Sequence, residues 1–175
     1  MKVWDALVRL IHWSLAIGIA GAWITSGTWA RFHEPIGYAV LAIAALRLAW
    51  GFIGGPYARF CQFVRSPSHT VRYARLLLHR GEPRYLGHNP LGGWMVLALL
   101  ACAVATAATG WLFTTDRFWG DDTVQSLHFA FAWALLGLVA LHLCGVIFTS
   151  IRHRENLVRS MISGHKRAPD EHDVS

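Results

Sequence analysis

Four histidines of this sequence lie in or beside long apolar segments, where an imidazole is costly without a partner. They are His12, His33, His128 and His142. The last two are fourteen residues apart in one apolar run, LHFAFAWALLGLVALH at 127–142. Fourteen residues of α-helix rise about 21 Å and return to within about 40° of the same face. His128 and His142 therefore point the same way at two depths of a helix.

Depth along a helical bundle pairs His12 with His142, and His33 with His128. Two facing imidazoles offer one axial ligand to each face of a flat macrocycle, which is what a bis-histidine haem requires. A single histidine in such a segment is more often a hydrogen-bonded packing residue, but four that pair by depth favour metal ligation. The sequence therefore predicts two haem b groups, bound non-covalently with these four histidines as iron ligands.

Cysteine content and charge exclude other classes of site. The chain has three cysteines and no CxxCH motif, so covalent haem attachment is unsupported. A cysteine-ligated cluster usually needs four thiolates, which also argues against an iron–sulfur protein. The net charge of +6 does not indicate nucleic-acid binding, because the basic residues lie between apolar runs.

Composition indicates the elements that must position the histidines. The chain is 54% hydrophobic and 15% charged, whereas about a quarter of the residues of a soluble domain are charged. Four segments have the roughly 20 apolar residues that a membrane-spanning helix needs. They are 6–25, 36–55, 91–113 and 124–149. The prediction is an all-α, integral membrane four-helix bundle, with Pro35, Pro56 and Pro90 at helix edges.

The distribution of arginine and lysine predicts the orientation of this bundle. The loop at 56–90 and the tail after 151 are rich in basic residues, whereas the two opposite loops carry only Arg31 and Arg117. Both termini are therefore predicted to be cytoplasmic. His12 and His142 then lie in the inner half of the membrane. His33, just before the second helix, lies with His128 at the outer side.

The chain is predicted to form one four-span cytochrome domain at 1–160 and a polar cytoplasmic tail at 161–175. From Gly164 onward this tail is predicted to be disordered. The segment HTVRYARLLLHR at 69–80 is typical of a basic amphipathic helix on a membrane surface, and a partner-binding role is the alternative.

Arg47 and several glycines lie inside the spans. Arg47 has two readings: it extends towards the cytoplasm, or it pairs with a propionate of the inner haem. The glycines at 18, 21, 37 and 137 either leave room for a porphyrin or serve helix packing.

Together these residues resemble the bacterial cytochrome b561 and nickel–iron hydrogenase cytochrome b subunit family. The matching stretches are VWDALVRLIHW (3–13), FHEPIGYAVLAIAALRLAWG (32–51), GHNPLGGWMVLALL (87–100) and LHFAFAWALLGLVALH (127–142). The resemblance places the family's axial ligands on His12, His33, His128 and His142, and its second-span arginine on Arg47.

The resemblance implies a di-haem b-type cytochrome of the bacterial inner (plasma) membrane. Such a protein relays single electrons in a respiratory chain between quinone, either ubiquinone or menaquinone, and a hydrogenase or periplasmic cytochrome. Small members instead oxidise superoxide and reduce quinone, so the chain is either a carrier alone or also a quinone oxidoreductase. The inner-side candidates for a quinone site are His88, His153 and Arg59.

A proton or metal transporter that uses the intramembrane histidines is the alternative from another class. Transporters usually also place carboxylates in their spans. The four predicted spans contain essentially none, which favours electron transfer over transport.

Overall fold

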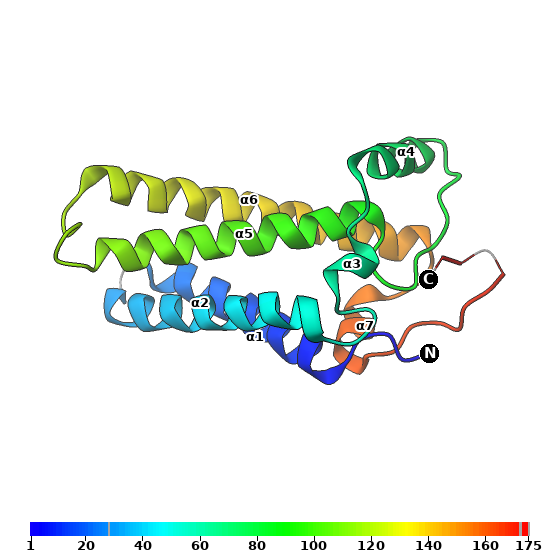
Figure 1. Cartoon of the computed structure of the whole chain (residues 1–175), viewed down its shortest axis with the longest axis horizontal. Coiled ribbons are helices and arrows are strands. Elements are labelled where there is room, and N and C mark those ends of the chain that lie inside the picture. Colours follow the sequence, from blue (N-terminus) through cyan, green and yellow to red (C-terminus); the bar gives the residue numbers. More distant parts are fainter. Residues whose placement is uncertain (28, 172, 175) are drawn as a thin grey trace. The chain divides into compact units, whose positions relative to one another are not determined.

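The computed structural model describes residues 1–27, 29–171 and 173–174. These residues form helices and two isolated backbone bridges, with no strand among them (Figure 1). The helices are α1 (Ala6–Thr25), α2 (Ala30–Ile53), α3 (Phe60–Phe63), α4 (Pro67–Leu78), α5 (Pro90–Phe113), α6 (Asp122–Arg152) and α7 (Leu157–Ser163).

Four of these helices, α1, α2, α5 and α6, are long and apolar enough to cross a membrane. The predicted all-α fold with four spans is therefore confirmed. Only 6% of the most apolar window of α6 is buried inside the protein. Apolar side chains at the surface are stable when hydrocarbon surrounds them, and each helix satisfies its own backbone hydrogen bonds there.

The start of α2 differs from the prediction. This helix begins at Ala30 rather than near residue 36, so Pro35 lies inside it and His33 lies near its first turn. A proline removes one backbone hydrogen bond from a helix. Pro35 is exposed and close to the helix start, where the freed carbonyl can meet solvent. The proline therefore does not set the helix boundary, and His33 is held by helical backbone.

The described chain divides into two compact units. One consists of Leu10–Ala49 and Ala98–Val139, and the other of Met1–Arg9, Trp50–Leu97 and Ala140–Ser175. The first unit contains the C-terminal parts of α1 and α5 and the N-terminal parts of α2 and α6. The second contains α3, α4, α7 and the remaining sections of the long helices.

Close helix contacts hold the first unit together. A Cβ atom on Gly18 would lie 2.7 Å from Val40 Cγ2, so the missing side chain lets α1 and α2 approach. The rings of Trp23 and Trp133 meet edge to face at 5.0 Å and join α1 to α6. Small residues and aromatic pairs of this kind supply the packing that drives helix association in a bilayer.

The second unit contains α4 (Pro67–Leu78), so the helix predicted at 69–80 is present two residues earlier, and its place on a membrane surface stays a prediction. Ser66 caps this helix by accepting a hydrogen bond from the backbone N–H of His69, and Pro67 occupies its first turn. Both features are typical helix starts. On one face of α4, Tyr73 is buried against Tyr85, with the two ring centres 5.5 Å apart.

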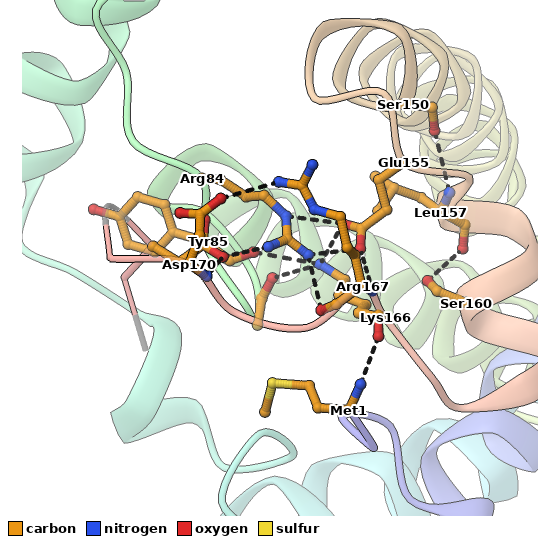
Figure 2. Close-up of polar contacts among 12 residues, drawn as sticks. Met1, Arg84, Tyr85, Ser150, Glu155, Leu157, Ser160, Lys166, Arg167 and Asp170 are labelled. Atoms are coloured by element: carbon orange, nitrogen blue, oxygen red, sulfur yellow. Dashed lines mark hydrogen bonds and ion pairs between the residues drawn. The ribbon is translucent and has the colours of Figure 1, made fainter.

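The C-terminal segment is not disordered, so that prediction is wrong for the residues described. The carbonyl of Gly164 accepts backbone hydrogen bonds from Val3 and Trp4 at 2.9 and 3.2 Å. The carbonyl of Lys166 accepts one from the amino group of Met1 at 2.6 Å (Figure 2). Composition alone indicated disorder because the segment is polar. In the folded chain, backbone N–H groups and the amino group at the N-terminus donate hydrogen bonds to carbonyls of this segment.

A buried ion cluster also fastens this segment (Figure 2). The Arg84 guanidinium donates to Glu155 Oε1 at 2.7 Å and pairs with Asp173. The same Glu155 oxygen accepts the backbone N–H of Arg167 at 2.9 Å. Lys166 Nζ lies 3.8 Å from the other oxygen of Glu155. Buried charges are stable only when paired in this way.

Candidate functional site

The structure brings His33 of α2 and His128 of α6 together. Their ring centres are 6.0 Å apart and their planes are nearly perpendicular, at 89°. Two metal–imidazole bonds of about 2 Å each, with about 1 Å from each nitrogen to its ring centre, also total roughly 6 Å. The separation therefore suits one metal ion held between two imidazoles.

In both rings Nδ1 lies within hydrogen-bond distance of a backbone carbonyl oxygen. His33 Nδ1 lies 2.8 Å from the carbonyl oxygen of Ala22, and His128 Nδ1 lies 2.9 Å from that of Thr106. A carbonyl only accepts hydrogen bonds, so each Nδ1 carries the hydrogen and each Nε2 keeps a lone pair. Metal-ligating histidines almost always make this contact, which fixes the ring orientation. Both imidazoles are thus prepared to bind a metal through Nε2.

The two accepting carbonyls share a second feature. A threonine hydroxyl three residues further along the helix lies near the same oxygen, at 3.2 Å for Thr25 and Ala22 and at 3.0 Å for Thr109 and Thr106. The shorter hydrogen bond of each hydroxyl goes to the preceding carbonyl, Gly21 at 2.7 Å and Ala105 at 2.8 Å. Ala22 lies in the last turn of α1, where carbonyls lack a helical N–H partner, and the imidazole of His33 supplies one.

Gly110 gives His128 access to the carbonyl of Thr106. It lies four residues after Thr106 and therefore on the same side of α5. A Cβ atom on Gly110 would lie 3.0 Å from His128 Cε1 and 3.2 Å from Nδ1. The supporting role of Thr25 and Thr109 could not be seen without the neighbouring helices.

The donor set of this pair fits haem iron. The described part of the chain contains no group of three or more His, Cys, Asp or Glu side chains that could hold a metal ion. A bare zinc ion is almost always four-coordinate, whereas a haem supplies its equatorial ligands itself and needs only axial ones. Two facing imidazoles with free Nε2 atoms meet that need.

The predicted inner ligands are each in a membrane-spanning helix. His12 lies in α1 and His142 in α6, and both are half-buried. They belong to different compact units, so their pairing stays a prediction. Arg47 of α2 is only 6% exposed, which argues against a side chain extended along the surface and leaves the propionate role as a prediction.

The glycines suggested as porphyrin space fall into two groups. Gly18 and Gly21 face side chains of α2, because a Cβ there would meet Val40 at 2.7 Å and Ile36 at 3.7 Å. Gly37 and Gly137 have no atom within 4 Å of a Cβ. The first two glycines therefore serve helix packing, and only the second two leave open space.

The residues suggested for quinone binding lie in the second unit. His88 packs between the rings of Trp4 and Phe63, at 4.8 and 4.5 Å between ring centres. His153 follows α6, and its burial lowers the pKa of the imidazole. Arg59 precedes α3 and is exposed. Nothing in these positions tests a quinone site, which stays a prediction.

Sequence comparisons find a matching family and several relatives of the chain. A sequence model of the prokaryotic cytochrome b561 family matches residues 3–164. A probable Ni/Fe-hydrogenase B-type cytochrome subunit of Rhizobium leguminosarum bv. viciae is 25% identical over 221 aligned positions, which cover 98% of this chain and 90% of that protein. Proteins of the same name from Bradyrhizobium diazoefficiens and Azotobacter vinelandii are each 26% identical, over 96% and 97% of this chain and 86% and 89% of their own. No solved structure gives a significant match.

Proposed function

Because the chain belongs to the prokaryotic cytochrome b561 family and is a membrane b-type cytochrome of electron transfer, we propose that it is a di-haem protein. It moves single electrons across the bacterial inner membrane between quinone and a redox partner of a respiratory chain. The observation that carries this proposal is the His33–His128 pair, with its ring centres 6.0 Å apart and each Nδ1 on a backbone carbonyl.

The groups around the His33–His128 pair determine how a haem would be held there. A haem held at this pair would supply a one-electron couple. His33 and His128 would hold it through Nε2. The carbonyls of Ala22 and Thr106 hold both rings in one orientation, so little reorganisation would accompany a change of charge.

The second haem is assigned to His12 and His142. Both histidines are in membrane-spanning helices and half-buried, and the helix order pairs them by depth. Arg47, which is only 6% exposed inside α2, is the proposed partner of a propionate, because a guanidinium can bind a carboxylate through two parallel hydrogen bonds. Two haems at different depths would span much of the bilayer.

The orientation is proposed from charge. Arginine and lysine are concentrated in the chain between α2 and α5 and after α6, and such residues mark cytoplasmic loops. Both termini are therefore assigned to the cytoplasm. The His33–His128 pair then lies towards the periplasm, where a soluble electron partner can approach it.

The relatives are named as hydrogenase subunits, which makes a hydrogenase one candidate partner. The alignment with the Rhizobium protein spans 221 positions, more than the 175 residues of this chain, so the relatives carry segments that this chain lacks. A periplasmic cytochrome is the other candidate partner, and a superoxide-oxidising quinone reductase is the second candidate function.

Spectroscopy on the purified full chain tests the proposal. We expect a b-type reduced-minus-oxidised spectrum and two haems per chain by pyridine haemochrome assay. His128→Ala should remove one haem and His142→Ala the other, while His79→Ala, at an exposed site after α4, should keep both. A folded but colourless protein would refute the cytochrome assignment. A haem content that His128→Ala leaves unchanged would refute the ligand assignment.

Activity assays then separate the two candidate functions. Reduction of quinone by superoxide, measured in the haem-loaded protein, would establish the reductase. Electron exchange with a periplasmic cytochrome or a hydrogenase, without a superoxide reaction, would establish the carrier.

A further inference from the structure

A cavity of about 330 Å³ lies between α4, the chain that follows it and the C-terminal segment. This volume is at the lower end of the range of small-ligand pockets. Its polar lining consists of His69, Arg72, Tyr73 and Tyr85, and Val174 contributes from the C-terminal segment. All of these residues belong to one compact unit, and none of them has a part in haem binding.

The polar groups of this cavity are hydrogen-bond donors without partners in the described chain. Tyr73 is only 3% exposed, and neither its hydroxyl nor that of Tyr85 bonds to a described residue. Burial raises the pKa of Tyr73 to about 12, so its phenol keeps the hydrogen and can donate it. His69 Nδ1 is buried without a hydrogen-bond partner among the described residues. A phenol that lines the cavity and has no protein partner can donate to a ligand with acceptor oxygens.

The charge of the cavity selects an anion. Arg72 lines it, and the positive charges of Arg65 and Arg72 both act on the Tyr85 phenol, whose pKa burial raises and these charges lower. The carboxylate that acts on Tyr73 is Glu82, and it is neutralised by Arg152 at 2.6 Å. Among the described residues that line the cavity, none carries a side-chain carboxylate.

We propose that this cavity binds a phosphate group through Arg72, His69 and the phenols of Tyr73 and Tyr85. Phosphate offers several acceptor oxygens and negative charge, which match a guanidinium surrounded by neutral donors. The phosphate belongs either to an anionic phospholipid headgroup at the membrane surface or to a free phosphate compound.

The C-terminal segment forms one wall of the site. Val174 N–H donates to the carbonyl of Arg84, and Leu86 N–H donates to the carbonyl of Val174, both at 2.9 Å. A ligand that needs this wall binds only when the segment is docked. Binding of phosphate therefore stabilises the docked segment by mass action.

Binding to the purified, haem-loaded full chain tests this proposal. The probes are inorganic phosphate by calorimetry, and nanodiscs of phosphatidylglycerol or phosphatidylcholine by native mass spectrometry. We expect Arg72→Gln to weaken binding at least tenfold and Tyr73→Phe to weaken it several-fold. The matched control is Arg75→Gln, which removes the same charge from the same helix outside the cavity and should leave binding unchanged.

The outcomes distinguish the two sources. Retention of phosphatidylglycerol but not phosphatidylcholine, unaffected by inorganic phosphate, identifies a lipid headgroup, whereas saturable binding of inorganic phosphate identifies a free compound. Equal weakening by Arg72→Gln and Arg75→Gln would overturn the proposal, because it would mean that general charge attracts the probe. Absence of binding by every probe would overturn it as well.

Proteolysis gives a second measurement that does not depend on haem or on the electron-transfer proposal. Trypsin should cleave after Arg167, which is exposed, and mass spectrometry quantifies the released C-terminal peptide. The bound probe should slow this cleavage in the native protein and not in Arg72→Gln. Equal slowing in both proteins would contradict the cavity as the binding site.

Discussion

Replacing Gly110 with alanine should weaken haem binding at the His33–His128 pair. The new Cβ atom would lie 3.0 Å from His128 Cε1, and ordinary contacts begin at 3.4 Å. The imidazole must therefore move by about 0.4 Å, a shift that takes its 2.9 Å hydrogen bond to Thr106 to roughly 3.3 Å, beyond the usual range. Loss of such a supporting contact costs about 10- to 100-fold in metal affinity, or about 1.4–2.8 kcal/mol.

The assay is transfer of haem from the detergent-solubilised protein to excess apomyoglobin, followed by the loss of one b-type signal. The matched control is Gly145→Ala, since a Cβ at Gly145 meets no atom within 4 Å. Both substitutions change helix propensity in the same favourable sense, so only the contact with His128 separates them. If Gly110→Ala and Gly145→Ala release haem at the native rate, the inferred support of His128 by Thr106 is wrong.

The remaining predictions concern the second unit. Tyr73, whose pKa burial raises to about 12 against an ordinary 10.0, should titrate late at 295 nm; the unfolded chain releases this proton first, so unfolding free energy should fall more between pH 10 and 12 in the native protein than in Tyr73→Phe. Burial opposes ionisation of Glu155, but hydrogen bonds from Arg84 and Arg167 hold its pKa below 4.5; its stabilisation is present above that value and lost as pH falls through the lowered pKa, so hydrogen–deuterium exchange of the C-terminal segment, corrected for the intrinsic rate at each pH, should rise as the pH falls through that range. Arg84→Gln removes the cation that pairs with the carboxylates of Glu155 and Asp173, which should lower the unfolding free energy by roughly 3 kcal/mol. Tryptic cleavage after Arg167 should then rise at least tenfold, whereas Arg80→Gln, at an exposed site, should leave it unchanged.

The four spans could be predicted because length and apolar composition determine them. The start of α2 could not, since proline usually marks a helix edge. The cost of Pro35 depends on whether the carbonyl it frees meets solvent, and that is a property of the folded chain. The docking of the C-terminal segment was missed for a similar reason. Its polarity suggested disorder, but Arg84, 89 residues earlier in the sequence, pairs with Asp173 only in the folded chain.

The ligands of the His33–His128 site were easier to predict than the groups that hold them. Their depths follow from helix order and from a rise of about 1.5 Å per residue. The supporting carbonyls of Ala22 and Thr106 come from α1 and α5, which the sequence does not place against His33 or His128. Any carbonyl can accept an imidazole N–H, so residue identity carried no signal there. The only residue types that mark these two carbonyls in the sequence are the threonine three residues after each of them and the glycine at 110.

The composition of the spans explains why carbonyls take this role. Apart from Glu34 and Asp122 near the helix starts, α1, α2, α5 and α6 contain no Asp or Glu. A carboxylate beside each ligand would place a charge in hydrocarbon at considerable cost, so the imidazole N–H must find a neutral acceptor. Most helical carbonyls already accept a hydrogen bond and are covered by the side chain four residues later. The carbonyl of Ala22 lies in the last turn of α1, so no helical N–H occupies it. The carbonyl of Thr106 is followed four residues later by Gly110, so no side chain covers it. The same scarcity of charge that argues against a proton pathway therefore limits where haem ligands of this bundle can be supported.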